Sequence, residues 1–329
     1  MPVIGTDRHD DALRLTDVTK RYAHHVAVRA LSLRVPRGTV FGLLGPNGAG
    51  KTSTIRMTLN IIAPDEGQIE VLGRPFDDPA ITDRLGYLPE ERGLYRKMRV
   101  RDVLRFLGRL KSMPKKGLDA QIDSWLERFQ LRGAGGEDWG AARVDELSRG
   151  MQQKVQFIGA LLHDPELVVL DEPFSGLDPV NSQALKDTVT ELRQRGRTVI
   201  FSTHVMENAE RMCDAICIIS NGEKVLDGTV SEVRKQHGAR IAVVAFDGSP
   251  SPEVLTVLHD PSLVVRINDG NRLIEAELAP DVTAHALLAA LVGAGANIER
   301  FELVRPSLHR IFLERVGAAG VEVGLSGHG

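Results

Sequence analysis

The segment Gly45-Pro-Asn-Gly-Ala-Gly-Lys51-Thr52 constrains the possible fold of this chain more than any other segment. It fits the pattern G-x-x-x-x-G-K-[ST] and follows an apolar, β-prone run at residues 39–44. Residues 51–62 then have a helical pattern that Pro64 closes. When a strand, such a loop and a helix follow one another, the backbone N–H groups of the loop can surround a phosphate at the positive end of the helix. The sequence therefore predicts an α/β domain that binds a nucleotide.

The loop supplies most of the predicted contacts to ATP and Mg²⁺. Lys51 is expected to reach the β- and γ-phosphates, and the Thr52 hydroxyl is expected to ligate Mg²⁺. The predicted ATP-binding residues of this loop are Gly45, Pro46, Asn47, Gly48, Ala49, Gly50, Lys51, Thr52 and Ser53.

A second motif, Leu167-Val-Val-Leu-Asp171-Glu172, places two carboxylates at the end of an apolar strand. Asp171 is the predicted partner of Mg²⁺, as in a P-loop NTPase. Glu172 follows directly, so the two side chains diverge, and Glu172 is predicted to polarise the water that attacks the γ-phosphate. The two motifs together predict hydrolysis in addition to binding.

Apolar runs elsewhere in the chain predict the sheet around these motifs. Residues 167–170 and 198–201 have the length and branching of strands buried on both faces, which implies a parallel sheet covered by helices. About 115 residues separate the glycine-rich loop from the first of these runs. They contain helical patterns at 100–111 and 118–129, and predict an inserted helical subdomain at about 98–165.

A hairpin signal marks the end of the first domain. Asn221-Gly222 separates two apolar runs, and both residues tolerate a positive φ, so the first domain is placed at residues 10–230. Shorter elements follow and predict a small α+β accessory domain at 238–316, with a flexible glycine-rich tail at 317–329. In this second domain, strands are expected at 241–246, 263–267, 273–278 and 298–303, and helices at 252–259, 283–293 and 307–316.

Composition narrows the classes of partner and compartment. Lys and Arg number 41 against 44 Asp and Glu, so nucleic acid is not an expected partner. The two cysteines, Cys213 and Cys217, cannot form a disulfide framework. Residues 1–11 lack the apolar core of a secretory signal, and the weakly polar stretch 284–296 is too short to span a bilayer. We expect a cytoplasmic protein, which another chain would have to hold at a membrane if it works there.

Further motifs, in order, resemble those of the ATP-binding cassette (ABC) family over residues 10–230. Leu147-Ser-Arg-Gly-Met151 resembles the family signature Leu-Ser-Gly-Gly-Gln. The resemblance implies a RecA-like core with an antiparallel β subdomain and a helical subdomain. It also implies that Ser148 and Gly150 bind the γ-phosphate of ATP held by a second subunit. Ser148 before a helix fits this role, because a helix start presents free N–H groups to an anion.

The same resemblance assigns roles to three more residues. Asp178, in Ser175-Gly-Leu-Asp178-Pro179, matches the D-loop that crosses the dimer interface. His204, in Ser202-Thr-His204, matches the switch histidine that contacts the γ-phosphate and positions the attacking water. Tyr22 stands where the family has an aromatic side chain that stacks on adenine.

Departures from the family pattern point to one branch of it. Arg149 and Met151 replace Gly and Gln of the signature, and Glu90 replaces the glutamine of the Q-loop. A carboxylate at position 90 still accepts hydrogen bonds from water bound to Mg²⁺, so Glu90 joins Thr52 and Asp171 as a predicted metal residue. With the C-terminal domain, these features resemble the bacterial exporter ATPases of sodium efflux and drug resistance.

The resemblance implies two protein partners and a location. They are a transmembrane permease, with residues 90–101 as the candidate contact, and a second ATPase subunit in a homodimer. The chain would lie at the cytoplasmic face of the membrane. One alternative is a soluble ABC-type ATPase acting on ribosomes or DNA, which usually has paired cassettes, a coiled coil or zinc modules. Another is a non-catalytic nucleotide-gated regulator, which would need neither Glu172 nor His204.

Overall fold

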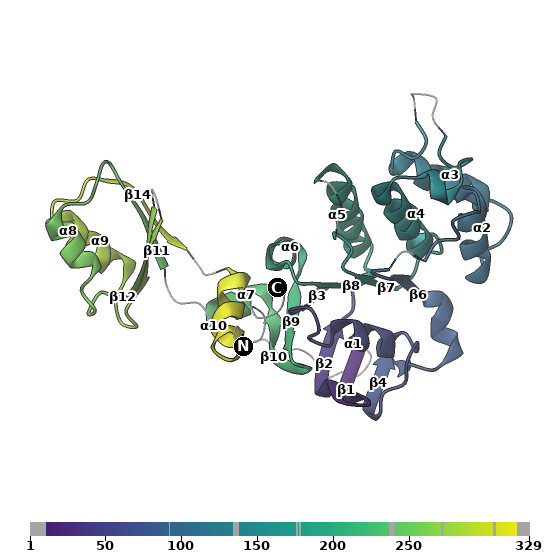
Figure 1. The fold of residues 1–329 in the computed structure, drawn as a ribbon, viewed down its shortest axis with the longest axis horizontal. Coiled ribbons are helices and arrows are strands. Elements are labelled where there is room, and N and C mark those ends of the chain that lie inside the picture. Colours follow the sequence, from purple (N-terminus) through teal and green to yellow (C-terminus); the bar gives the residue numbers. More distant parts are fainter. Residues whose placement is uncertain are drawn as a thin grey trace, which may run out of the picture. The chain divides into compact units, whose positions relative to one another are not determined.

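The computed structural model describes residues 11–91, 93–133, 138–175, 177, 179–236, 241–270, 273–304 and 307–320. The chain divides into two compact units, residues 1–229 and 230–329 (Figure 1). Asp178, the predicted D-loop residue, and residues 321–329 of the predicted tail lie outside the described residues.

A six-stranded sheet forms the centre of the first unit, in the order β10-β9-β3-β8-β7-β6. All its neighbouring strands are parallel except the β10–β9 pair. Every residue of β3, β7 and β8 is buried, and burial on both faces was predicted for the runs 167–170 and 198–201 in β7 and β8. The strands are β3 (Val40–Leu44), β6 (Leu85–Leu88), β7 (Leu167–Asp171), β8 (Thr198–Thr203), β9 (Ala215–Ser220) and β10 (Glu223–Thr229).

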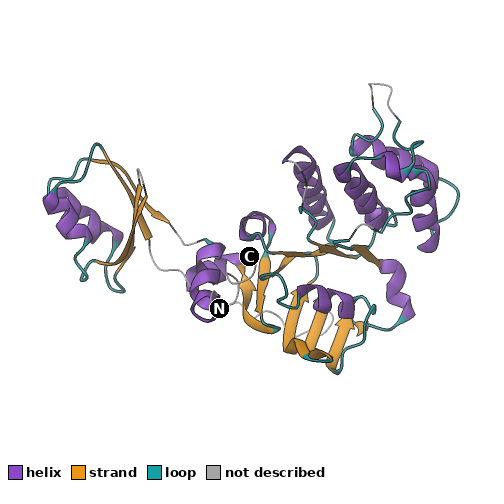
Figure 2. Cartoon of the chain, viewed as in Figure 1, coloured by secondary structure: helices purple, strands orange, loops and turns teal. Residues whose placement is uncertain are grey.

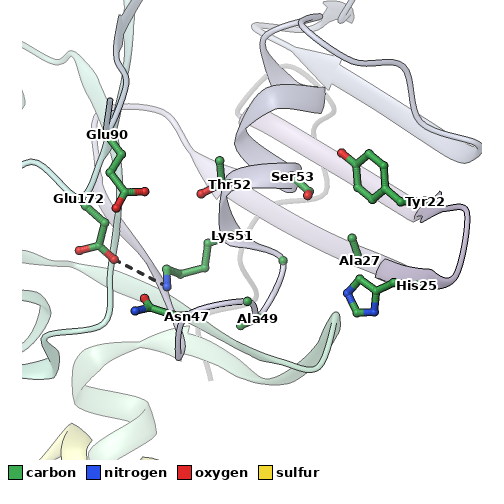
Figure 3. A pocket seen from close by; sticks show the side chains of 12 residues that line it. Tyr22, His25, Ala27, Asn47, Ala49, Lys51, Thr52, Ser53, Glu90 and Glu172 are labelled. Carbon is green, nitrogen blue, oxygen red and sulfur yellow. Dashed lines mark ion pairs between the residues drawn. The ribbon is translucent and has the colours of Figure 1, made fainter. Parts of the chain in front are cut away.

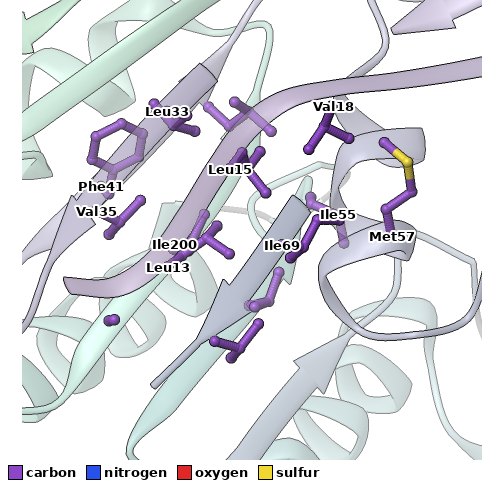
Figure 4. Close-up of a cluster of buried hydrophobic side chains, with 14 of the residues drawn as sticks. Leu13, Leu15, Val18, Leu33, Val35, Phe41, Ile55, Met57, Ile69 and Ile200 are labelled. Atoms are coloured by element: carbon purple, nitrogen blue, oxygen red, sulfur yellow. The ribbon is translucent and has the colours of Figure 1, made fainter. Parts of the chain in front are cut away.

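An antiparallel sheet packs beside this one with the order β2-β1-β4-β5. Its strands are β1 (Asp11–Tyr22), β2 (His25–Pro36), β4 (Glu66–Val71) and β5 (Arg74–Pro75). Helix α1 (Lys51–Thr58) follows β3, and η1 (Pro79–Arg84) precedes β6. Apolar side chains from both sheets and α1, among them Leu15, Ile55 and Ile200, form one buried cluster (Figure 4). Burial of a large aliphatic side chain such as Leu15 or Ile55 contributes about 1.5–3 kcal/mol, so the cluster anchors the helix that begins at Lys51.

Helix α1 ends earlier than the predicted 51–62. Asn60 has φ 53°, its N–H donates to Met57 O at 3.1 Å, and the N–H of Ile61 donates to Arg56 O at 2.9 Å. This pair of bonds around a left-handed residue is a Schellman motif, in which asparagine takes the place of the more common glycine. The helix therefore stops at Thr58, well before Pro64.

Between β6 and β7 the regular elements of the described chain are helices, joined by turns and loops (Figure 2). The elements are α2 (Val100–Leu110), α3 (Leu118–Arg128), η2 (Val144–Glu146) and α4 (Arg149–Leu161). Phe129, just after α3, packs against Phe157 of α4 with ring centroids 5.7 Å apart. The Lys154 ammonium also donates to Phe129 O at 2.9 Å, so α3 and α4 form one packed group. Helices α5 (Pro179–Gln194) and α6 (Met206–Met212) pack against strands of the parallel sheet.

The hairpin and the cysteines of the first unit agree with their predictions. Asn221 and Gly222 have φ of 50° and 79° and join β9 to β10 as an antiparallel pair. Cys213 and Cys217 are free thiols, and burial raises the pKa of both. They therefore act as packed side chains.

The second unit contains a four-stranded antiparallel sheet in the order β12-β13-β11-β14. The chain order β-α-β-β-α-β is the split βαβ arrangement, and the apolar sides of α8 and α9 close one core against the sheet. Its elements are α7 (Val230–Gln236), β11 (Ile241–Phe246), α8 (Pro252–Leu258), β12 (Val264–Gly270), β13 (Leu273–Leu278), α9 (Ala284–Gly293), β14 (Ile298–Val304) and α10 (Leu308–Gly320).

The tail was predicted to start at residue 317, and this boundary is wrong. Helix α10 continues to Gly320, because Ala318 and Ala319 favour helix strongly enough to carry it past Gly317. Arg310 fixes this helix to the sheet through an ion pair with Glu277 at 2.5 Å, and it also pairs with Glu314 at 3.0 Å. None of the helices in the described part of the chain has the length and hydropathy of a membrane-spanning segment.

Candidate functional site

Four parallel neighbours, β3, β8, β7 and β6, end at the same edge of the central sheet (Figure 1). Leu44 pairs with Thr203, and Asp171 pairs with Ser202, so the loops after these strands emerge together. The glycine-rich loop follows β3, and His204 follows β8. Asp171 is the last residue of β7, with Glu172 directly after it, and Glu90 follows β6. In open α/β sheets, ligands bind at this carboxyl edge.

Two glycines allow the loop to pass close to neighbouring backbone. Gly45 has φ 152°, and a Cβ there would lie 2.1 Å from Ile219 O. Gly50 has φ 104°, and its Cβ would lie 2.3 Å from Ala27 O. Gly50 is also the N-cap of α1 and offers no side-chain cap, so the first N–H groups of the helix are left for a ligand.

Lys51 lies inside this loop. Its side chain is 6% exposed, and its ammonium donates to Gly45 O at 2.7 Å and to Pro46 O at 3.1 Å. The ammonium is also 3.7 Å from Glu172 Oε1. Burial lowers the pKa of Lys51, and the negative charges of Glu172 and Asp171 partly oppose that shift. The lysine is thus a desolvated cation facing the pocket.

A pocket of about 360 Å³ opens above the loop (Figure 3). Lys51, Glu90 and Glu172 lie at one end, and Tyr22 and His25 lie at the other. Such a division suits a ligand with a polyphosphate at one end and a ring system at the other. The lining residues are Tyr22, His25, Ala27, Asn47, Gly48, Ala49, Gly50, Lys51, Thr52, Ser53, Glu90 and Glu172. His25 and Ala27 were not predicted, because only the hairpin turn after Tyr22 brings the start of β2 to the pocket.

The carboxylates of the second motif diverge as predicted. Asp171 is 1% exposed; Ser202 donates a hydrogen bond to its Oδ1, and its Oδ2 is buried with no hydrogen-bond partner among the described residues. Glu172 is 8% exposed, and its Oε1 is 3.0 Å from His204 Nδ1. The half-exposed His204 and the buried Lys51 therefore both contact the same carboxylate.

The residues at this edge suit Mg²⁺ bound together with a nucleotide. Among the described residues, no group of three or more His, Cys, Asp or Glu side chains could hold a metal by itself. Mg²⁺ in nucleotide sites instead takes one or two protein oxygens and completes its shell with phosphates and water. The unpartnered Oδ2 of Asp171 and the Thr52 side chain in the pocket offer such oxygens.

Comparison with known proteins identifies the family. Residues 28–175 match the family model described as ABC transporter, and residues 228–316 match that of the ATP-binding protein DrrA1-3-like, C-terminal domain. The uncharacterized ABC transporter ATP-binding protein YhaQ of Bacillus subtilis is 42% identical over 306 residues, 93% of this chain and 99% of the relative. The chain belongs to the ATP-binding proteins of ABC transporters.

Two further relatives of this ABC ATPase support the assignment. The Nod factor export ATP-binding protein I of Rhizobium etli is 40% identical over 235 residues, 69% of this chain and 73% of the relative. A solved structure of an ATP-binding subunit of an ABC transporter is 30% identical with TM-score 0.63, over 68% of this chain and 92% of that one. The predicted α/β cassette with a small α+β C-terminal domain is confirmed, and the protein is an ATP-binding ATPase.

The signature residues of the ABC ATPase lie apart from its own pocket. Ser148 is the N-cap of α4, where its hydroxyl accepts a hydrogen bond from Met151 N at 3.3 Å. Gly150 follows in the first turn, and a Cβ there would lie 3.3 Å from Asn181 Nδ2. Neither residue lines the pocket around Lys51, and Arg149 between them is exposed.

Helix α4 is nevertheless tied to the loops that carry the carboxylates. Gln153 donates to the carbonyl oxygen of Pro173 at 2.7 Å, and Pro173 directly follows Glu172. Gln156, one turn further along α4, donates to the carbonyl oxygen of Glu91 at 3.0 Å, and Glu91 directly follows Glu90. Both glutamines are at most 9% exposed, so the first bond is buried and the second is partly buried. Neither of these two bonds was predicted, since polar residues in a helix are usually solvated.

Proposed function

We propose that this ABC ATPase powers a separate transmembrane permease that exports its substrate, through ATP-driven closure of a dimer. The observation that carries the proposal is the arrangement of one pocket and one signature helix in the same chain. Lys51 and Glu172 line the pocket and His204 contacts Glu172, whereas Ser148 and Gly150 lie outside the pocket. Each copy thus supplies part of two sites.

In the proposed site, the loop and Tyr22 hold ATP. The Lys51 ammonium and the N–H groups at the start of α1 neutralise the phosphates. Tyr22, 45% exposed at the far end of the pocket, stacks on adenine. The remaining loop residues, from Gly45 to Ser53, shape the backbone around the phosphates.

Glu172 acts as the general base for the attacking water, and His204 orients it. A carboxylate 3.0 Å from the imidazole and 3.7 Å from the ammonium is held at the polyphosphate end of the pocket. Thr52 and Asp171 would hold Mg²⁺, with Glu90 accepting from its bound water. When bound, Mg²⁺ neutralises charge on the β- and γ-phosphates.

The second chain of a homodimer completes each site with its Ser148, Gly150 and Asp178. An isologous two-fold arrangement brings the free N–H groups at the start of each α4 to the ATP of the opposite chain. Gln153 and Gln156 then link the helix start that meets one ATP to the loops beside the other ATP.

The relatives, and not the pocket, support export, and the location at the cytoplasmic face of a membrane rests on the proposed permease partner. A relative that covers most of this chain is named for Nod factor export. Tyr95 within the segment 90–101 and Phe106 in α2 are 53% and 38% exposed, and their rings meet edge to face with centroids 5.4 Å apart. Exposed aromatic side chains of this kind are enriched where protein partners dock, so this segment is the proposed permease contact.

Mixing two inactive variants tests the shared site. Lys51→Ala weakens ATP binding to its own loop and removes a charge that turnover needs, and Ser148→Arg blocks the signature that serves the other chain. Each variant alone should hydrolyse no ATP. A 1:1 mixture should recover about a quarter of wild-type activity, because half the dimers are mixed and each mixed dimer has one complete site. A mixture as inactive as its components would contradict the shared site.

A further inference from the structure

The side chain of Ser202 in β8 makes two hydrogen bonds that the pairing of the strands does not require. Its side chain is 0% exposed, and its Oγ accepts a hydrogen bond from the backbone N–H of Glu172 at 3.1 Å. The same hydroxyl donates to Asp171 Oδ1. Backbone pairing already holds β7 and β8 in register from Leu167 to Asp171. The hydroxyl therefore adds a contact between the strands at the point where both carboxylates emerge.

The bond to Glu172 supports an unfavourable backbone conformation. Glu172 has φ 47°, in the left-handed region that a residue with a Cβ adopts at a cost. A buried N–H without a partner would add to that cost. Ser202 supplies this partner, so the hydroxyl helps to hold Glu172 in the conformation that directs its carboxylate towards Lys51 and His204.

The bond to Asp171 selects one of two carboxylate oxygens. A serine hydroxyl has one proton, and here that proton is directed to Oδ1. Oδ2 is left buried and without a hydrogen-bond partner among the described residues. The serine thus orients the carboxylate so that a single oxygen remains for a ligand.

We propose that Ser202 is a positioning residue for ATP hydrolysis, whose one hydroxyl sets the backbone of the general base and the free oxygen of the Mg²⁺ partner together. This inference rests on the roles proposed above for Glu172 and Asp171. Outer-shell hydrogen bonds of this type orient metal-binding groups, and their loss typically reduces metal affinity or activity about 10- to 100-fold.

Ser202→Ala removes the hydroxyl and Ser202→Thr retains it. Thr188→Val is the matched control, because Thr188 is also buried, at 1% exposed, and its hydroxyl also makes two bonds, to Ala184 O at 2.8 Å and from Arg128 at 3.1 Å. The first readout is ADP binding by calorimetry over a range of Mg²⁺ concentrations, which needs no turnover. The second is steady-state hydrolysis of ATP.

For Ser202→Ala, the Mg²⁺ concentration that half-maximally tightens ADP binding should rise about 10- to 100-fold. ADP affinity without Mg²⁺ should stay within about twofold, and kcat should fall more than KM changes. Ser202→Thr should restore much of both, and Thr188→Val should match the wild type. If Ser202→Ala does not fold, Ser202→Cys, with its weaker thiol bonds, should show the same losses to a smaller extent.

A Ser202→Ala or Ser202→Cys chain with the Mg²⁺ dependence and kcat of the Thr188→Val control would overturn the positioning role. That result leaves the proposed function intact as long as the wild type binds ADP more tightly with Mg²⁺. A wild type whose ADP affinity ignores Mg²⁺ would instead overturn the proposed function, and the positioning role with it.

Discussion

Gly45→Ala should change the shape of the phosphate loop while leaving its phosphate-binding groups in the chain. The added Cβ would lie 2.1 Å from Ile219 O in β9, more than 1 Å inside ordinary van der Waals contact. Because β9 pairs with β3, this carbonyl cannot move without breaking the sheet. The steric overlap should cost about 1–3 kcal/mol, and the positive φ of 152° should add about 1–2 kcal/mol.

Gly48→Ala is the matched control in the same loop. Gly48 also has a positive φ, 80°, but a Cβ there would meet no atom within 4 Å. Its substitution should cost only the conformational part, about 1–2 kcal/mol. The difference between the two variants therefore isolates the close approach of the loop to Ile219.

Urea unfolding of both variants, followed by tryptophan fluorescence, measures the free energy of unfolding, and a coupled assay measures ATP turnover. Gly45→Ala should lose about 100-fold in turnover, since a loop displaced by roughly 1 Å misplaces the phosphates, and Gly48→Ala should lose much less. Equal losses of stability and turnover in the two variants would refute the steric reasoning.

Three further outcomes follow from the pocket and its surroundings. Lys51→Ala should weaken ATP binding at least about tenfold by calorimetry, because a charge-assisted contact to phosphate is lost, and unchanged affinity would remove that lysine from the site. Tyr22→Ala should weaken ATP binding about two- to tenfold while Tyr22→Phe should not, as measured by the same titration; equal effects would argue against ring stacking. Burial lowers the pKa of His163 from 6.5, so the unfolded chain takes up the proton first and the free energy of unfolding should fall as the pH drops below about 6.5. His163→Gln should flatten that decline in urea unfolding at pH 7.5 and 5.5, and an identical decline would exclude this histidine as its source.

The chemical motifs could be identified from the sequence because each consists of residues that are close together in the chain. A glycine-rich loop between a buried strand and a helix, and a carboxylate pair closing an apolar run, depend on neighbours within a few residues. Parallel strands then bring their carboxyl ends to one edge, so Lys51, Asp171, Glu172 and His204 could be expected to lie close together. The functional roles of these residues remain predictions.

The contacts that the sequence did not reveal are made between distant segments. His25 reaches the pocket only because β1 and β2 form a hairpin. Ser202 bonds a residue 30 positions earlier in the chain, and Gln156 bonds one 65 positions earlier. No pattern in one segment specifies which backbone group a buried side chain in another will meet.

Local conformation caused the errors in element boundaries and the missed strands. Asn60 adopts a left-handed conformation that ends α1, which a helical pattern through residue 62 does not reveal. Strands β1 and β2 were not recognised from alternation, since Asp17 and Ala30 have positive φ and the pairing shifts register between Leu15 and Val18. Such bulges interrupt the two-residue period on which strand prediction relies.

The shared ATP site is tested most directly by the variant Glu172→Gln. This change removes the water-activating carboxylate while leaving the phosphate loop and the signature helix in place. In gel filtration with ATP and Mg²⁺, the variant should retain ATP affinity, show no turnover and elute at about twice the monomer mass of 36.0 kDa. Elution as a monomer with ATP bound would contradict a site built from two chains.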